Sequence, residues 1–421
     1  MSNPVTRELQ DIRSSVRAVS IAFVLAAACA LPVAVTSTAQ AQTYHVIYNF
    51  TKGYDGGQPS AGVTLDRAGD LYGTATVGGT YNQGTIFQLK RSGSDWTLSS
   101  LYSFRDNGDG KDPIARVVFG PNGSLYGTTY AGTVYNIRPP LSFCKTVSCP
   151  WTLTTLASDL QHPGYGDLAF DSLGNLYGTT SSGGIYDYGE VFELSPSNGH
   201  YTETAIYNFS RNDPGGVYPY NGVVFDNAGN LYGTTHQSGS GGYGAVFELS
   251  PAGPPWTESV LHAFSGNPDG GYLVAGVIFD QAQNLYGATS YYGPLHSGTI
   301  FELTPYQQWN FDLLYSMGSC DCNSGPYASL TIDASGNLYG TNYYNADHDL
   351  DMGSIFKLSP NGDGSWTYTD LHDFTGGNDG AYPISNVVTD AYGNLFGTAS
   401  RGGTGKACGV AGCGIVWEIT P

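Results

Sequence analysis

Aromatic and histidine residues gather in four loop-like stretches of the chain. The stretch 182–188 reads SGGIYDY, His236 opens HQS, Tyr291 opens YYGPLH and Tyr343 opens YYN. Aromatic rings can stack on sugar rings, and their polar edges can hydrogen-bond sugar hydroxyls. The candidate ligand-binding residues are therefore Tyr186, Tyr188, His236, Tyr291, Tyr292, His296, Tyr343 and Tyr344. In a chain with 32 Tyr, the alternative that these rings only cover loop backbone stays open.

An acidic segment follows the last of these stretches. Asp347, Asp349 and Asp351 alternate with His348 and Leu350, a spacing that can bring carboxylate oxygens together on Ca²⁺. The rest of an EF-hand loop is missing, because Leu358 stands where the bidentate Glu belongs. Calcium is the single cofactor that the sequence suggests, and an ordinary solvated acidic loop is the alternative.

No catalytic residue can be assigned from the sequence. A zinc-protease HExxH motif, a Ser/His/Asp arrangement and a phosphate-binding glycine loop are all missing from it. A pair of carboxylates, such as Asp187 with Asp347 or Asp349, could act as acid and base on a glycoside if the fold brought the pair together.

Six of the seven cysteines form three close pairs. These are Cys144 with Cys149, Cys320 with Cys322, and Cys408 with Cys413. In an oxidising compartment such pairs predict disulfides. The alternative for Cys320 and Cys322, which one residue separates, is a strained and redox-labile bridge.

The same short segment recurs seven times. GNLYGTT at 174–180 has near-copies whose aromatic residue falls at 72, 126, 232, 286, 339 and 396, so the period is about 54 residues. Each repeat holds four short β-branched and aromatic segments, separated by Gly, Pro, Asn and Asp. An Asp-x-x-Gly-Asn turn precedes the LYGT segment at 171–175, 226–230 and 333–337. Glycine at one position of every LYGT segment predicts that neighbouring sheets approach too closely there for a side chain.

This pattern predicts an all-β, seven-bladed β-propeller of four-stranded antiparallel blades in residues 42–421. The last repeat ends after its third strand, and Thr43 to Phe50 resembles the fourth-strand segment 202–209. The N-terminal strand should therefore complete the last blade and close the ring. The loops between second and third strands and those between blades open on one face. Because they are the long ones, we expect function on that face.

The LYGT segment, the glycine-rich loop after it and the GTxFEL segment together resemble the Gloeo/Verruco (GloVer) tandem repeat of secreted, surface-anchored bacterial proteins. The resemblance covers nearly all of residues 42–421. It implies an extracellular location and no particular reaction. The second repeat departs from the pattern, with Gly120 in place of the turn Asp, and the C-terminus carries no evident anchor.

Residues 1–41 differ from the rest of the chain. Arg7, Arg13 and Arg17 precede an apolar run over 18–35, and Ala39-Gln40-Ala41 fits a signal-peptidase site. We expect a cleaved secretory signal, hence a secreted, extracellular or periplasmic protein without a transmembrane segment in the mature chain. We also expect a monomer.

The net charge of the chain limits the classes of partner that it can bind. With 35 acidic residues against 16 Lys plus Arg and a net charge of −19, a nucleic-acid partner is excluded. The favoured hypothesis is a secreted or cell-surface binding module whose partner is a carbohydrate or another cell-surface molecule. The alternatives are a polysaccharide-cleaving hydrolase or lyase, and a purely structural scaffold.

Overall fold

The computed structural model describes residues 42–140, 151–162, 166–251, 255–306, 309–318, 325–344 and 352–421. The expected signal peptide at 1–41 lies outside the described residues. So do the cysteine pairs Cys144–Cys149 and Cys320–Cys322, and the acidic residues Asp347, Asp349 and Asp351.

The described residues form seven four-stranded antiparallel sheets. The inner strands are β2 (Thr64–Leu65), β6 (Val118–Phe119), β10 (Ala169–Phe170), β14 (Val224–Phe225), β18 (Ile278–Phe279), β22 (Thr331–Ile332) and β26 (Val388–Thr389). The second strands are β3 (Leu71–Ala75), β7 (Leu125–Thr129), β11 (Leu176–Thr180), β15 (Leu231–Thr235), β19 (Leu285–Thr289), β23 (Leu338–Asn342) and β27 (Leu395–Ala399). The third strands are β4 (Thr85–Ser92), β8 (Thr133–Arg138), β12 (Glu190–Ser197), β16 (Ala245–Ser250), β20 (Thr299–Thr304), β24 (Ser354–Pro360) and β28 (Ile415–Thr420). The outer strands are β5 (Asp95–Ser103), β9 (Thr152–Ala157), β13 (His200–Asn208), β17 (Thr257–Ala263), β21 (Asn310–Ser316), β25 (Trp366–Asp373) and β1 (Thr43–Asn49).

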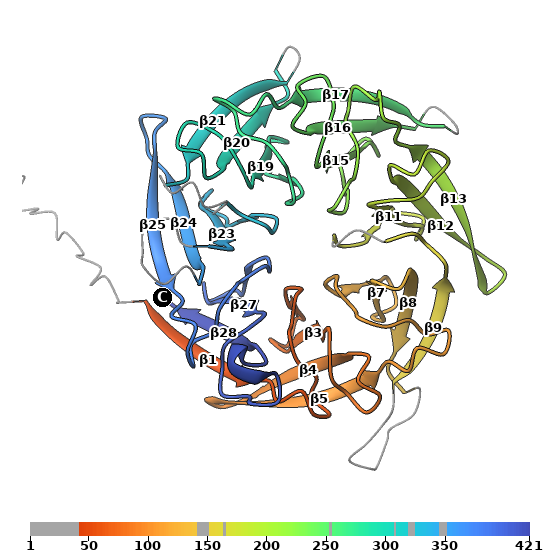
Figure 1. Ribbon diagram of the computed structural model, residues 1–421, viewed down its shortest axis with the longest axis vertical. Helices are drawn as coiled ribbons and strands as arrows, with labels where there is room; N and C mark the ends of the chain where they lie inside the picture. Colours follow the sequence, from red (N-terminus) through yellow and green to blue (C-terminus); the bar gives the residue numbers. More distant parts are fainter. Residues whose placement is uncertain are drawn as a thin grey trace, which may run out of the picture. The chain divides into compact units, whose positions relative to one another are not determined.

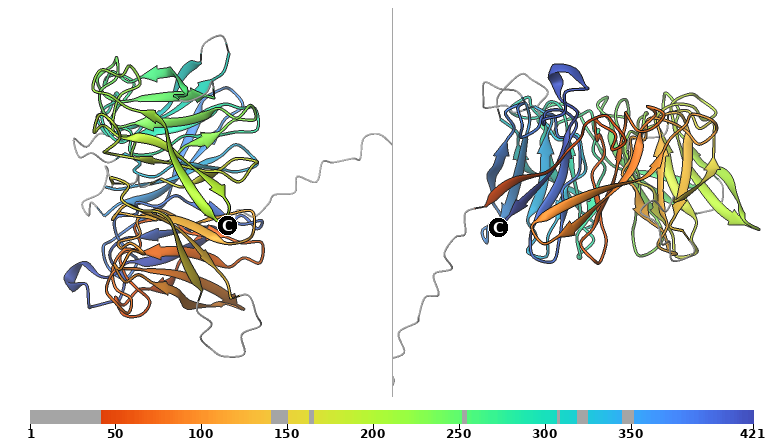
Figure 2. Two further views of the ribbon diagram at one scale, coloured as in Figure 1. Left: turned by 90° about the vertical axis from the view of Figure 1, so that its right-hand side faces the viewer. Right: turned by 90° about the horizontal axis from the view of Figure 1, so that it is seen from below.

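The sheets are arranged around an axis as the blades of a propeller, which confirms the predicted fold class (Figure 1). The strand order of the last sheet is β1-β28-β27-β26, with Thr43 opposite Thr420 and Asn49 opposite Ile415. The N-terminal strand therefore closes the ring, as expected. Seen from the side, the strands run between two loop faces, and the 3₁₀ turn η2 (Gly409–Ala411) projects from one of them (Figure 2).

The hydrophobic core lies between neighbouring blades. One buried cluster joins Tyr72, Ile86 and Leu101 of the first blade to Val117 and Leu125 of the second. Corresponding clusters join the other blades around the ring. Each blade therefore depends on its neighbours for burial of its two faces, which is why a closed ring stabilises all of them.

The glycine of LYGT is explained by a contact within one blade. Gly233 lies opposite Phe247 on the adjacent third strand, and a Cβ on Gly233 would stand 2.6 Å from the end of that ring. The same pairing recurs at Gly73 with Phe87 and at Gly340 with Phe356. The prediction that a neighbouring sheet excludes the side chain was therefore wrong. The aromatic residue of the GTxFEL segment lies across its own blade and fills that space.

The threonine of LYGT joins blades. Thr74, Thr179, Thr234, Thr341 and Thr398 each donate a hydrogen bond to a backbone carbonyl just ahead of the next blade's inner strand, at 2.8–3.2 Å. Of these, Thr398 reaches Ala61 and thereby spans the closure point. The fifth blade has Ala288 at this position and lacks the donor.

The tyrosine of LYGT is held by the turn before it. In the fourth blade, Asp226 accepts backbone N–H bonds from Ala228 and Asn230 at 2.8 and 2.9 Å, and Tyr232 Oη donates to it at 3.1 Å. The ring of Tyr232 then meets Phe279 of the next blade edge to face. The Asp-x-x-Gly-Asn segment is thus a turn, as predicted, and it positions an aromatic ring between blades.

A second repeated acid caps the loops between blades. Asp109 accepts a bond from Tyr102 Oη at 2.7 Å, and Asp269 bonds His262 Nε2 at 3.0 Å. His372 Nε2 lies 3.4 Å from Asp379 Oδ2 at the equivalent position, without a hydrogen bond between them. His262 and His372 also stack on Phe311 and Tyr44. Both histidines therefore pack against a ring of the neighbouring blade.

One of the three predicted disulfides lies in the described part of the chain. Cys408 and Cys413 are bonded across the η2 turn, and the Cys413 side chain is buried beside Phe50.

Candidate functional site

The seven repeats differ at the residue just ahead of each inner-strand segment. Aligned on Val223-Val224-Phe225-Asp226, this axial position holds Gly62, Arg116, Asp167, Gly222, Gly276, Ser329 and Asn386. Two of the seven are charged, and they have opposite signs. Chain order places them on the second and third blades, next to each other in the ring.

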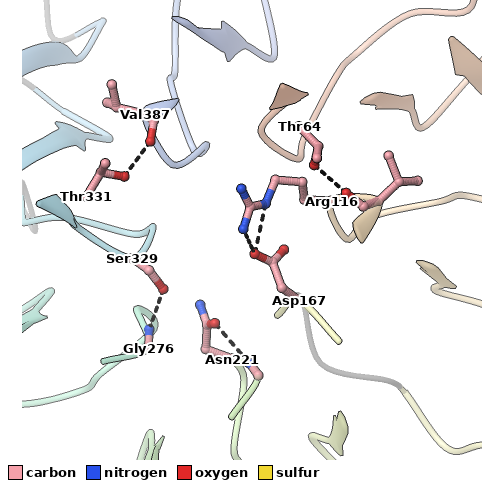
Figure 3. Close-up of polar contacts among 10 residues, drawn as sticks. Thr64, Arg116, Asp167, Asn221, Gly276, Ser329, Thr331 and Val387 are labelled. Carbon is pink, nitrogen blue, oxygen red and sulfur yellow. Dashed lines mark hydrogen bonds and ion pairs between the residues drawn. The ribbon is translucent and has the colours of Figure 1, made fainter. Parts of the chain in front are cut away.

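Arg116 and Asp167 pair at the axis. Arg116 Nε donates to Asp167 Oδ2 at 2.8 Å, and Nη2 donates to the same oxygen. Figure 3 shows both side chains pointing into the centre of the ring, with Asn221 and Ser329 around them. Their side chains keep 24% and 27% of their surface exposed, so the pair faces an open space and is not packed away.

A cavity of about 440 Å³ opens on the loop face above this pair. We call it the mouth cavity. Its walls are Ser60, Ala61, Gly62, Arg116, Asp167, Tyr220, Asn221, His236, Val274, Tyr291, Tyr327, Ala328, Tyr343, Ile384 and Asn386. Its size falls in the range of small-molecule sites, and its lining is apolar and aromatic with a few polar groups.

Aromatic rings make one wall of the mouth cavity. The rings of Tyr220 and His236 lie 4.8 Å apart between centroids, and Tyr327 lies 5.0 Å from Tyr343. Tyr272 links His236 to Tyr291, at 5.2 and 5.6 Å. Tyr291 Oη and Tyr327 Oη are hydrogen-bonded at 2.8 Å. The rings of this aromatic wall come from the fourth, fifth and sixth blades, and the Arg116–Asp167 pair comes from the second and third.

The wall contains a histidine that stays neutral. Burial lowers the pKa of His236 to about 4, although a hydrogen bond to the Leu273 backbone opposes the shift. Its Nδ1 atom is buried and has no hydrogen-bond partner in the described part of the chain. The wall therefore carries no positive charge from this ring at neutral pH.

A second cavity of about 510 Å³ lies along the inner strands. Val224, Ile278, Ile332 and Val388 give it an aliphatic lining. Arg116, Asp167, Asn221 and Asn386 line both cavities. These four residues therefore form the boundary between an aromatic space on the loop face and an aliphatic space below it.

The structure brings together only some of the candidate ligand-binding residues. His236, Tyr291 and Tyr343 line the mouth cavity. Tyr292 packs on Tyr272 and Tyr344 packs on Tyr343, so each contacts a ring of the aromatic wall.

The other candidates lie apart from the cavity lining. Tyr188 packs on Tyr218. Tyr186 and His296 are exposed in loops of the third and fifth blades. Asp187 accepts a bond from the Gly183 amide within its own loop.

Sequence reasoning missed four residues of the mouth cavity that matter most. Tyr220, Tyr327, Arg116 and Asp167 all stand just ahead of inner strands, in segments that looked like ordinary connections. The signal was present in the alignment of the repeats. The axial position holds glycine in three blades and residues of opposite charge in two neighbouring blades. A position that differs in this way between otherwise similar repeats indicates a functional site.

Within the described residues, no group of three or more His, Cys, Asp or Glu is arranged to hold a metal ion. The predicted calcium segment lies outside that part of the chain. No helix among the described residues is long and apolar enough to cross a membrane.

The fold and the repeat define the class of protein: a seven-bladed β-propeller built from tandem repeats. The model of the Gloeobacter/Verrucomicrobia repeat matches residues 33–224, 131–324 and 219–421. The chain belongs to this family. No curated protein matches it.

Solved structures with a similar fold are distant in sequence. The extracellular domain of a hybrid two-component system from B. thetaiotaomicron has a TM-score of 0.55 and 12% identity over 90% of this chain. This chain spans 41% of that protein.

Two further neighbours have lower scores. A Bacteroides uniformis protein assigned as a 6-phosphogluconolactonase has a TM-score of 0.47 and 15% identity, over 75% of this chain and 84% of its own. A Trichoderma reesei protein of Carbohydrate-Active Enzymes Family AA12 has a TM-score of 0.44 and 14% identity, over 91% and 96%.

Proposed function

We propose that this propeller is a binding module whose ligand is a carbohydrate held in the mouth cavity. The observation that carries the proposal is the pairing of an aromatic wall with a polar floor in one cavity of about 440 Å³. Sugars present apolar C–H faces to rings and hydroxyls to polar groups, so they need both surfaces at once.

The charge of the cavity supports a neutral ligand. The described lining carries one cation, Arg116, and one anion, Asp167, which neutralise each other. His236 adds no charge, because its pKa is about 4. The chain as a whole has a net charge of −19, which disfavours approach of a polyanion.

We also propose that the protein works outside the cytoplasm. The basic and apolar composition of residues 1–41 and the disulfide between Cys408 and Cys413 support this location. Fractionation of producing cells, followed by N-terminal sequencing, should find a mature chain that begins at Gln42. Retention of the protein in the cytoplasm with residues 1–41 intact would contradict it.

The binding proposal is tested by screening the purified protein on an array of neutral oligosaccharides and measuring hits by calorimetry. We expect at least one hit that Tyr291→Ala weakens about tenfold or more, the loss expected for one stacking ring. The matched control is Tyr392→Ala, whose ring is 86% exposed in the turn between β26 and β27, away from the cavity. It should bind like the wild type.

Two results would replace the proposal. Absence of binding to every oligosaccharide would leave the ring as a scaffold. Release of shortened sugars from a bound polysaccharide would make it a hydrolase or lyase, which the same assay detects by chromatography of the products.

A further inference from the structure

The Arg116–Asp167 pair presents a donor and an acceptor side by side to the mouth cavity. Both Arg116 contacts go to a single carboxylate oxygen, Oδ2. Among the described residues, neither Arg116 Nη1 nor Asp167 Oδ1 has a hydrogen-bond partner. A guanidinium N–H beside a carboxylate oxygen matches two adjacent hydroxyls, one of which accepts while the other donates.

The fold does not require this pair. The axial position is glycine in the first, fourth and fifth blades, serine in the sixth and asparagine in the seventh. The hydrogen bonds that join blades use Thr234 and its equivalents at five of the seven junctions, where the axial residue is glycine, arginine or asparagine. Arg116 Nη1 and Asp167 Oδ1 face the cavity without a partner among the described residues, and the fold does not need them there. We therefore infer that a ligand in the cavity binds these two groups.

The position of the pair restricts which part of a ligand can reach it. Arg116, Asp167, Asn221 and Asn386 lie at the boundary between the mouth cavity and the aliphatic cavity below. The blades close completely around this boundary, since β1 completes the last sheet. A polymer cannot lie across a floor that is walled on every side, so only the end of a chain can descend to it.

We propose that the Arg116–Asp167 pair recognises the vicinal hydroxyls on the terminal unit of a neutral glycan, so that the mouth cavity binds chain ends. This inference rests on the proposed carbohydrate function. The aromatic wall stacks on the ring, and the pair selects its hydroxyls. Adjacent free hydroxyls occur at both the reducing and the non-reducing end of a glycan. The experiment below shows which of the two ends binds.

The test uses the full mature chain, with cello-, malto-, xylo- and manno-oligosaccharides of three and six units as probes in calorimetry. Arg116→Met/Asp167→Leu removes both charges together, a change that ion pairs tolerate without loss of folding. We expect its melting temperature to stay within a few degrees and its affinity for the best probe to fall ~30-fold, as for loss of charge-assisted hydrogen bonds. Tyr392→Ala, in the exposed turn between β26 and β27, is the control and should keep the affinity.

Chain length and end chemistry supply independent readouts. If ends are recognised, three and six units of the best series bind with equal affinity per chain. Reduction of the probe to its alditol abolishes binding if the reducing end enters, and leaves it unchanged if the non-reducing end enters.

Four outcomes would overturn part of the account. Wild-type protein that binds no probe removes the proposed function itself. Binding that survives in the double variant overturns this inference alone, and so does affinity that rises in proportion to chain length. Tighter binding of oligogalacturonate than of any neutral probe overturns the preference for a neutral ligand.

Discussion

The outer parts of the blades and the axis of the ring differ in how they use repetition. In the loops between blades, an Asp accepts a bond from an outer-strand side chain again and again, as at Asp55, Asp109, Asp213 and Asp269. At the axis the corresponding position changes from blade to blade, and holds a charge in only two. The repeated residues build the ring, and the varied residues shape the space at its centre. The following predictions test that division.

The largest effect is expected at a repeated glycine. Gly233→Val forces a side chain into the ring of Phe247, which stands 2.6 Å from the Cβ position, and should lower the free energy of unfolding by about 3 kcal/mol. Gly362→Ala is the control, because nothing lies within 4 Å of its Cβ position. Urea denaturation of both variants measures the difference. Equal stabilities would contradict the cross-strand explanation of LYGT.

The next effect concerns the bonds between blades. Thr234→Val removes the hydrogen bond to the Ala275 carbonyl, leaves that buried acceptor unpaired and should cost about 1–2 kcal/mol. Thr97→Val, on the exposed side of β5, should change stability by less than about 0.5 kcal/mol. Thermal melts compare the pair. If Thr97→Val costs as much as Thr234→Val, the inter-blade role is refuted.

A partly buried acid, Glu258 of β17, lies beside Asp213 between the third and fourth blades. Burial, and then the neighbouring Asp213, raise the pKa of Glu258 to about 8 from 4.5. The folded state therefore holds this proton more tightly than the unfolded state. Stability should fall as pH rises from about 4.5 to about 8.

Glu258→Gln should flatten that slope and raise the melting temperature at pH 8 more than at pH 4. Asp95→Asn, at an exposed hairpin end, should leave the slope unchanged. Melts across this pH range supply the measurement. A slope that persists in Glu258→Gln would assign the dependence to another group.

The smallest effect on stability is expected at the axis. Asn386→Ala changes a residue that lines both cavities and whose side chain makes no hydrogen bond within the described residues. Its unfolding free energy should stay within about 0.5 kcal/mol of the wild type, while affinity for an oligosaccharide falls. A large loss of stability would show that the axial position also builds the ring.

The repeated part of the molecule could be predicted from sequence for a physical reason. Tyr232, Gly233 and Thr234 each act through a contact that recurs with the period of the repeat, so seven copies report one geometry. The strand at Thr43 to Phe50 was recognised because it copies an outer strand. The glycine was misassigned because a sequence does not show which sheet contributes the facing ring.

The candidate site could not be predicted from the sequence because its residues differ from one repeat to the next. Arg116 and Asp167 are 51 residues apart and meet only because blades follow one another around a ring. Tyr220 and Tyr327 belong to connections whose direction the strand pattern does not define. His236, Tyr291 and Tyr343 were selected for their residue type, and the same criterion also selected Tyr186 and His296, which lie outside the cavity lining.

The most direct test is a crystal structure of the mature chain soaked with the oligosaccharide that binds best. The account predicts density for a terminal sugar in the mouth cavity, stacked on Tyr327 and hydrogen-bonded to Arg116 and Asp167. Density on the outer strands, with the mouth cavity holding only water, would contradict it.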